Sequence, residues 1–196
     1  MISGRLAALR FGLGLALCLA AQPAAAQALA PGELMRRLAA VDRSQATFVE
    51  TRHSALLKEP LVLRGTLTYR RPAWLEKRVE QPYQERVAID GDVLTIENRR
   101  GRKLKTSVSG SPGIAALVEG IRATRAGDLA ALERHFQVSV SGRAERWSMA
   151  LKPFDEEVSR HVAAIVVSGA AGLITRFEVQ EAGGDRSVMD IREEVK

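Results

Sequence analysis

The sequence is poor in cysteine and in aromatic residues. It has one cysteine in 196 residues, together with five Phe, two Trp and two Tyr. A single cysteine excludes a disulfide-stapled scaffold and any cysteine-rich zinc or iron–sulfur site. Hydrophobic residues make up 46% of the chain, which argues against a fully disordered protein. The length fits one domain.

The charge balance is basic, with 29 Lys and Arg against 23 Asp and Glu and a net charge of +6. Such a balance first suggests nucleic acid or an anionic membrane surface as a partner. The densest basic run contains no aromatic residue on which bases could stack, so we expect no nucleic acid partner. The run either protects an edge strand by its charge or contacts an acidic partner or lipid headgroups. Its cations are Arg99, Arg100, Arg102, Lys103 and Lys105.

The first 26 residues have the pattern of a secretory signal peptide. Arg5 and Arg10 supply a positive start, residues 11–21 are apolar and uncharged, and Ala24-Ala25-Ala26 fits a cleavage site. A membrane anchor is the alternative, but the stretch is shorter than the ~20 residues that a spanning helix needs. We therefore expect cleavage after residue 26, a periplasmic location and one domain over residues 27–196.

Cys18 lies inside this leader and follows Leu17, where lipid attachment would require a small residue. The processed chain is therefore expected to have no cysteine. Loss of Arg5 and Arg10 lowers its net charge to +4. This smaller excess of positive charge, on the periplasmic side, favours membranes or acidic proteins over nucleic acid as partners.

Hydrophobic periodicity predicts an α+β fold. Pro31 opens a helical pattern that extends to about Ser44, with Leu34, Leu38 and Val41 on one face. The remaining pattern predicts one large antiparallel sheet, curved around a cavity, with helices on one side. Expected strands lie at about 45–52, 61–71, 74–80, 85–90, 93–97, 103–109, 136–141, 146–152, 162–169, 174–180 and 187–192, and expected helices at 114–121 and 129–134.

Motifs for catalysis or metal binding are missing from the sequence. His53, His135 and His161 stand at no metal-ligand spacing. No G-x-S-x-G nucleophile motif and no P-loop occur. Asp90-Gly91-Asp92 is too short for a calcium loop and is explained as a hairpin turn. We therefore expect no enzymatic activity, no cofactor and no metal.

Arg71 is the most informative polar residue. It follows Tyr69 by two residues and Leu67 by four, so it shares their apolar face if the strand continues that far. A charge on an apolar face needs hydrogen-bond acceptors, because an unpaired buried charge is costly. The alternatives are that the strand ends at Pro72 or that Arg71 is simply exposed.

Several short motifs occur in a family-specific order. An amphipathic helix around Leu34–Leu38 leads into a strand with Phe48, followed by a glycine–strand–Arg-Pro segment at residues 65–72. A hairpin at residues 89–94 follows Pro82 and Glu85, and later come Trp147–Pro153 and closing strands around Ile174 and Phe177. In this order the chain resembles the LolA-like periplasmic lipoprotein carriers over nearly all of residues 27–196.

The resemblance implies an open, incomplete antiparallel β-barrel with an N-terminal helix and a two-helix lid. The lid is expected at about Ile114–Ile121 and Leu129–Phe136. Its expected apolar contacts are Ile114, Leu117, Val118 and Ile121. Arg71 matches the family's arginine before proline, so the resemblance also implies that Arg71 is the latch that holds the lid closed.

The resemblance further implies a non-enzymatic carrier whose apolar cavity takes the acyl chains of a lipoprotein or another lipid and ferries it toward the outer membrane. An inner-membrane exporter and an outer-membrane receptor are the implied partners, and we expect a monomer. The pattern does not distinguish a cavity from a filled core. The expected cavity residues are Phe48, Leu67, Tyr69, Leu75, Leu94, Ile96, Met149 and Phe177.

Two features depart from the family. The strand over Trp74–Val79 is more charged than the aromatic-rich strand usual there, and the chain ends at Lys196 without the extra C-terminal segment of the best-known carriers. Both leave the handover partners and the cargo open. The main alternative function is a periplasmic sensor or interaction domain of the same fold that binds a protein.

Overall fold

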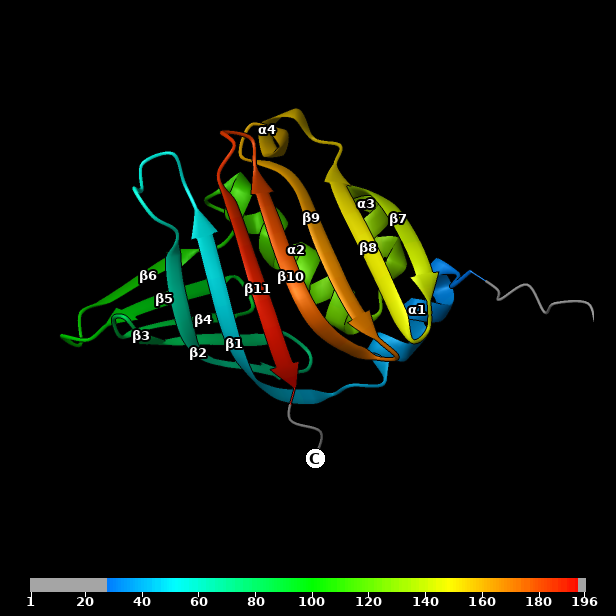
Figure 1. Ribbon diagram of the computed structural model, residues 1–196, viewed down its shortest axis with the longest axis horizontal. Coiled ribbons are helices and arrows are strands. Elements are labelled where there is room, and N and C mark those ends of the chain that lie inside the picture. Colours follow the sequence, from blue (N-terminus) through cyan, green and yellow to red (C-terminus); the bar gives the residue numbers. More distant parts are fainter. Residues whose placement is uncertain (1–27, 194–196) are drawn as a thin grey trace, which may run out of the picture.

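A computed structural model describes residues 28–193 (Figure 1). The expected signal-peptide cleavage site and Cys18 lie outside the described residues. The elements in chain order are α1 (Pro31–Ala39), β1 (Arg43–His53), β2 (Leu61–Arg70), β3 (Trp74–Gln81), β4 (Glu85–Asp90), β5 (Val93–Asn98), β6 (Lys103–Ser107), α2 (Pro112–Ala126), α3 (Leu129–His135), β7 (Phe136–Arg143), β8 (Arg146–Pro153), α4 (Glu156–Ser159), β9 (Val162–Ala170), β10 (Leu173–Glu181) and β11 (Arg186–Glu193).

All described strands belong to one antiparallel sheet of 11 strands, in the order β6-β5-β4-β3-β2-β1-β11-β10-β9-β8-β7. β1 stands in the middle and joins the meander β2–β6 to the meander β7–β11, pairing with β2 on one side and β11 on the other. The sheet curves around α2 and α3 but does not close, since β6 and β7 are its two edges (Figure 1). This confirms the predicted open, curved antiparallel sheet.

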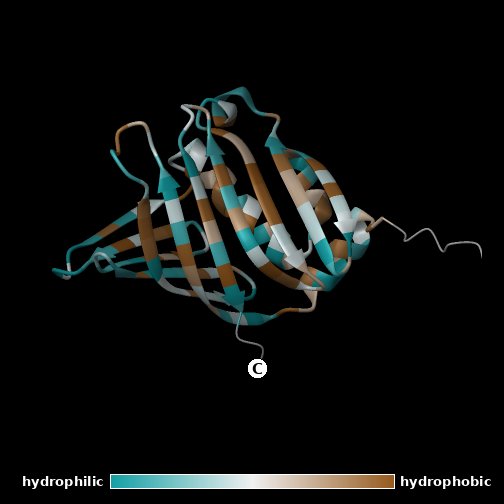
Figure 2. Ribbon diagram, in the orientation of Figure 1, coloured by the Kyte–Doolittle hydropathy of each residue, from teal (hydrophilic) through white to brown (hydrophobic). Residues whose placement is uncertain are grey.

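Alternating side chains determine which face of the sheet is covered. Hydrophobic and hydrophilic residues alternate along most strands (Figure 2). In β8 the buried residues Trp147, Met149 and Leu151 point to the helices, and Ser148 and Ala150 between them are only half-buried. Burying each large apolar side chain contributes about 1.5–3 kcal/mol, which fixes the register of the strand.

The helix α1 is shorter than the sequence pattern predicted. It ends at Ala39, where the backbone N–H of Ala40 donates to the carbonyl of Arg37 and the N–H of Val41 donates to the carbonyl of Leu38. The expected extension to Ser44 is wrong because β1 begins at Arg43, which pairs with Arg70 of β2. Sheet pairing therefore overrides the helical period over the last few residues.

The helix α2 packs through small residues together with Leu117 and Val118 of the predicted stripe. Its buried positions include Ala116, Gly120 and Ala123, whereas Ile114 is 39% exposed. A Cβ on Gly120 would lie 3.3 Å from Cδ1 of Ile165, so the missing side chain lets α2 approach β9 closely. The short helix α4, with Asp155 as its N-cap, was not predicted.

Within residues 28–193 there is no helix with both the length and the apolar character required to cross a membrane.

Candidate functional site

The predicted cavity residues share one face of the sheet. Cross-strand pairs place Tyr69 opposite Leu75, and Ile89 opposite both Leu75 and Leu94. Met149 and Phe177 both pair with Val167, so they point to the same face as each other. The register of the strands between them and β1 makes this the same face of the sheet. All eight lie on the concave face, which also carries the helices: Phe48, Leu67, Tyr69, Leu75, Leu94, Ile96, Met149 and Phe177.

The structure divides these residues among separate apolar clusters. Met149 belongs to the largest cluster, where buried side chains of α1, α2 and α3 fill the concave face over β8 and β9. Phe48 packs with Leu63 and Val79. Leu94 packs with Ile89 and with Val118 of α2. Leu75 and Ile96 join this third cluster, so only part of the predicted set comes together under one helix.

A cavity of about 330 Å³ opens beside α2. This volume is near the lower end of the range for small-molecule sites. The predicted lid residue Val118 is in its wall, but none of the eight predicted cavity residues is. Its lining is Asp92, Val108, Ser109, Pro112, Ala115, Ala116, Val118, Glu119, Arg122, His135, Asp155 and Val158.

Two arginines attach α2 to the sheet. Nη2 of Arg125 lies 2.6 Å from Oε1 of Glu193 at the end of β11, and the two side chains are 8% and 4% exposed. Oε1 of Glu193 also accepts from the backbone N–H of Ile174 at 3.0 Å. One turn earlier, Arg122 donates to the carbonyl of Gly91 in the β4–β5 turn. Sequence reasoning missed all of these contacts, because each joins residues that are far apart in the chain.

The surroundings of these arginines contain buried polar atoms without partners. Within the described residues, Oη of Tyr69, Nε of Arg122, Oγ1 of Thr124 and Nη1 of Arg125 are buried and accept or donate no hydrogen bond. The Arg125 guanidinium lies 5.7 Å from the centre of the Tyr69 ring, a cation–π distance. Each of these atoms can form a hydrogen bond with a water or ligand group that reaches it.

A second charged group lies on the concave face, where β1 carries Glu50 and β3 carries Lys77. Glu50 is 3% exposed and forms an ion pair with Lys77, while it accepts from Ser187 Oγ at 2.6 Å and Arg52 Nε at 2.9 Å. Burial raises the pKa of the Glu50 carboxyl, but Lys77 and these hydrogen bonds outweigh burial and hold the pKa below its usual value. Burial lowers the pKa of Lys77, and the Glu50 charge offsets part of that shift.

The three histidines stand apart from one another. His135 contributes to the cavity beside α2, while His53 lies at the end of β1 and His161 just before β9. In the part of the chain that the structure describes, no three His, Cys, Asp or Glu side chains are grouped so as to hold a metal ion.

The family profile described as outer membrane lipoprotein carrier protein LolA-like matches residues 23–188. The chain belongs to this family. No curated protein matches the LolA-like chain.

Three solved structures have a distant likeness to this LolA-like chain, with identities of 10% to 12%. A LolA superfamily protein from Nitrosomonas europaea is 10% identical, with a TM-score of 0.45 over 86% of this chain and 94% of its own. A domain named for outer membrane lipoprotein sorting from Vibrio parahaemolyticus is 10% identical, with a TM-score of 0.44 over 84% and 92%. A DUF1329 family protein from Desulfovibrio piger is 12% identical, with a TM-score of 0.37 over 83% and 90%.

Arg71, the latch residue expected from the LolA-like resemblance, contacts the end of α1. Its Nη2 donates to the carbonyl of Ala39 at 2.5 Å, and its Nε lies 3.1 Å from Oδ1 of Asp42. These partners belong to α1 and to its connection with β1, not to α2 or α3. The side chain is 37% exposed, so Arg71 is not the buried charge that its strand position suggested. Its role as a latch stays a prediction.

Proposed function

We propose that this protein is a non-enzymatic periplasmic carrier that binds the acyl chains of a lipoprotein or related lipid beneath α2 and ferries them toward the outer membrane. Membership of the LolA-like family supports the proposal. The observation that carries it is the attachment of α2, whose small side chains, buried Arg125 and half-buried Arg122 cover an apolar concave face.

The packing of α2 favours a helix that can be displaced. Apart from Val118, the buried apolar residues of α2 are small. Ala116, Gly120 and Ala123 remove little apolar area from water, so lifting them costs less than lifting large side chains would. The unpartnered polar atoms around Arg125 gain hydrogen bonds when water or the ester and amide groups of a cargo reach them. Both effects reduce the free energy needed to open the site.

The cargo chains would lie against the third apolar cluster. Ile89, Leu94 and Val108 form its floor, and Leu75 and Ile96 extend it along β3 and β5. Each buried CH₂ group contributes ~0.8 kcal/mol, so one or two acyl chains bind usefully without directed polar contacts. The cavity beside α2 is the starting point of this site, since Val108 and Val118 belong to both.

Arg71 can act on α2 indirectly, through the end of α1. It holds the carbonyl of Ala39, and Ala39 packs against Gly127, the residue that ends α2. A Cβ on Gly127 would lie only 2.6 Å from Cβ of Ala39, so the two helix ends are in close contact. We assign Arg71 the role of fixing the end of α1 against which α2 closes, with Arg125 as the direct contact to the sheet.

Native mass spectrometry of the protein purified from a membrane-containing extract tests the carrier function. The proposal predicts a bound acyl-bearing molecule, or uptake of added lipid by the empty protein. Repeated absence of both would exclude a carrier.

The filled half of the concave face favours a second candidate function, which is the binding of a protein partner. Over β8 and β9 the largest cluster leaves its members almost entirely buried, as in an ordinary core. A protein-binding domain of the same fold would need no lipid site. That candidate predicts capture of a protein partner by a variant that takes up no lipid, such as one with α2 fixed in place.

A further inference from the structure

Turns at one end of the strands β1–β6 carry exposed apolar residues and arginines. The loop β1–β2 and the turns β3–β4 and β5–β6 leave their strands at the same end, as the pairs Arg52–Leu61, Val79–Glu85 and Glu97–Lys103 show. The last two turns touch, since the N–H of Arg99 donates to the carbonyl of Gln84 at 3.1 Å. We call this end of the strands the tip face and define it by Leu56, Leu57, Tyr83, Arg99, Arg100 and Arg102.

The apolar side chains of the tip face are open to solvent. Leu56 is 93% exposed, Leu57 44% and Tyr83 41%. They project from two separate turns instead of forming one flat patch. A fluid surface can close around such separate side chains, whereas a rigid protein surface would need a matching pocket for each. Leucine and tyrosine are also residue types that enter the interfacial layer of a bilayer.

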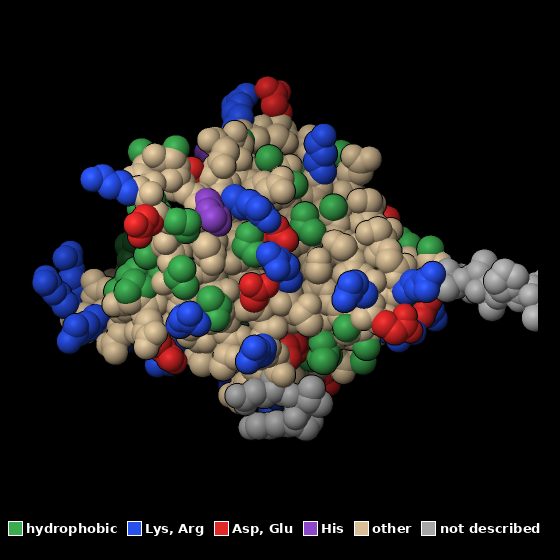
Figure 3. Space-filling view, viewed as in Figure 1, with side chains coloured by type: hydrophobic (Ala, Val, Ile, Leu, Met, Phe, Trp, Pro, Cys, Tyr) green, Lys and Arg blue, Asp and Glu red, His purple; other side chains and the backbone are tan. Residues whose placement is uncertain are grey.

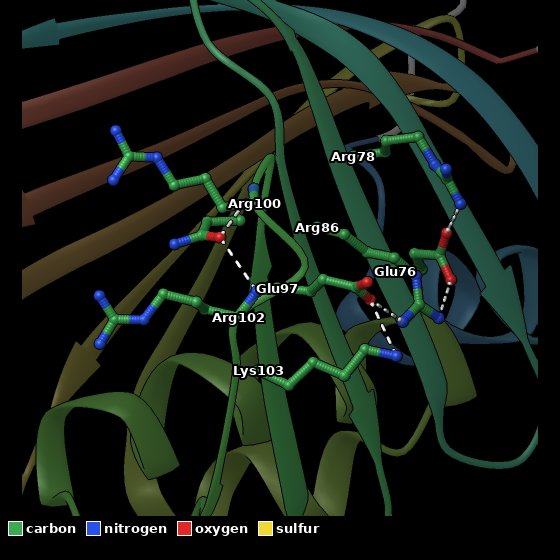
Figure 4. Close-up of polar contacts among 8 residues, drawn as sticks. Glu76, Arg78, Arg86, Glu97, Arg100, Arg102 and Lys103 are labelled. Atoms are coloured by element: carbon green, nitrogen blue, oxygen red, sulfur yellow. Dashed lines mark hydrogen bonds and ion pairs between the residues drawn. The ribbon is translucent and has the colours of Figure 1, made fainter.

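The three arginines are held by their backbone and free in their side chains. Oδ1 of Asn98 accepts from the N–H groups of Arg100 and Arg102 at 3.0 and 3.2 Å, so the turn has a fixed conformation. Arg100 and Arg102 extend away from the carboxylates of Glu76 and Glu97, which are contacted by Arg78, Arg86 and Lys103 (Figure 4). Arg99, Arg100 and Arg102 make no ion pair within the described residues.

The charge of these three arginines is therefore not compensated by an ion pair with any described residue. Figure 3 shows Lys and Arg side chains gathered where Figure 1 places the β5–β6 turn, with hydrophobic side chains beside them. Lys103 and Lys105 within β6 already protect this edge strand by their charge. Edge protection therefore does not explain the three arginines of the β5–β6 turn. Guanidinium groups bind phosphate oxygens in a forked geometry that lysine cannot match.

From this arrangement we propose that the tip face docks on a bilayer that contains anionic phospholipid, with the arginines on phosphate groups and the leucines and Tyr83 in the interfacial layer. The inference concerns a different surface from the site beneath α2 and does not rest on the proposed function. Each Lys or Arg near an anionic surface strengthens binding about fivefold, so three arginines account for about a hundredfold.

Co-sedimentation with vesicles tests the tip face. The protein is purified from expressing cells, and its N-terminal residue is checked by mass spectrometry so that no uncleaved leader contributes. We expect it to sediment with vesicles of phosphatidylcholine and phosphatidylglycerol, more weakly at high salt, and not with phosphatidylcholine alone. Two variants probe the two components of the face: Arg99→Gln with Arg100→Gln and Arg102→Gln, and Leu56→Ser with Leu57→Ser.

We expect the charge variant to lose about a hundredfold in affinity and the apolar variant about tenfold. Matched controls lie elsewhere: Arg36→Gln with Arg143→Gln and Arg146→Gln removes the same charge, and Phe154→Ser removes an apolar side chain that is 64% exposed. Both controls should bind like the parent. Failure of the parent to bind phosphatidylglycerol vesicles, or equal losses in variant and control, would overturn the proposal. Binding to polyglutamate but not to vesicles would overturn it in favour of an acidic protein partner.

Discussion

Arg125 of α2 and Glu193 of β11 form an ion pair with 2.6 Å between Nη2 and Oε1, and both side chains are more than nine-tenths buried. The contact joins the helix that covers the concave face to the strand beside β1, the middle of the sheet. It connects residues 68 positions apart, so it forms only when the sheet and α2 have both folded.

Glu193→Ala tests the importance of this pair. The substitution leaves the Arg125 guanidinium buried without its partner, and we expect the free energy of unfolding to fall by about 3 kcal/mol. The backbone amides of α2 should also exchange faster with solvent, measured by hydrogen–deuterium exchange. The control is Glu156→Ala. Glu156 is 88% exposed and its partner Arg160 68%, so their ion pair contributes less than about 1 kcal/mol. Equal effects of the two substitutions would mean that the buried pair does not hold α2.

Gly65→Ala tests the close approach of β2 to β3. A Cβ at this position would lie 1.8 Å from the carbonyl oxygen of Arg78 and 3.1 Å from Cε1 of Phe48. Because the nearest atom belongs to the backbone, β3 must move, and we expect a loss of about 3 kcal/mol in urea unfolding. Gly183→Ala is the control, since a Cβ there meets no atom within 4 Å. Comparable stability of both variants would rule out this packing.

Much of the fold could be predicted from the sequence because its determinants are local. Alternation over residues 61–69 and the Asp90-Gly91-Asp92 turn defined β2, β4 and β5 to within a few residues. The short helix expected at residues 129–134 has a local cap as well, since Oδ1 of Asp128 accepts from the N–H of Ala131 at 2.9 Å. The end of α1 was missed because the competing interaction, the pairing of Arg43 with Arg70, is not local.

The candidate site could be predicted only in part. Leu75, Leu94 and Ile96, expected in the cavity from the family resemblance, lie on one face of the sheet. The sequence pattern contains no information on how deeply α2 packs against that face. That depth depends on Gly120 and Ala123, which read as ordinary helix residues. The ion pairs Arg125–Glu193 and Glu50–Lys77 join residues that are close only in three dimensions. No spacing in the sequence therefore predicts them.

The Glu50–Lys77 pair predicts a pH-dependent stability. Because the folded pKa of Glu50 is below its ordinary value of about 4.5, the contribution is complete above that pH and is lost as the pH falls through the folded pKa. In Glu50→Gln the free energy of unfolding should therefore depend less steeply on pH below about 4.5. Glu76, Asp92 and Glu178, whose pKa values are also lowered, contribute to the slope that remains. Urea unfolding over a series of pH values measures both curves, and parallel curves would contradict the assignment.

The same pair predicts a partial rescue. At neutral pH, Glu50→Gln leaves the Lys77 ammonium unpaired on the concave face, at a cost of about 3 kcal/mol. Adding Lys77→Met removes that charge, so the double variant should be more stable than Glu50→Gln alone. Glu59→Gln, an exposed carboxylate in the β1–β2 loop, is the control and should leave stability unchanged. A double variant less stable than the single one would show that Lys77 does not depend on Glu50.

Arg71→Leu tests the assignment of Arg71 at the end of α1. The side chain is partly exposed, so folding should be largely intact, with a thermal transition close to the parent's. The closed arrangement of α1 and α2 competes with bound cargo. Because loss of the bond to Ala39 weakens that arrangement, closure should displace the cargo less readily and cargo release should slow. Release of a fluorescent acyl probe measures this rate, with Arg43→Leu, an exposed residue of β1, as the control. Equal release rates for Arg71→Leu and the parent would remove the role assigned to Arg71.

A reversible tether on α2 tests the carrier most directly. A Cβ on Gly113, in the first turn of α2, would lie 2.9 Å from Cβ of His161, within about 1 Å of the separation in a disulfide. The measurement is uptake of a fluorescent fatty acid by the variant Gly113→Cys with His161→Cys, first oxidised and then reduced. The account predicts no uptake while the disulfide holds α2 in place, and uptake equal to the parent's after reduction. Equal uptake in both states, or no uptake by the parent, would contradict a lipid site beneath α2.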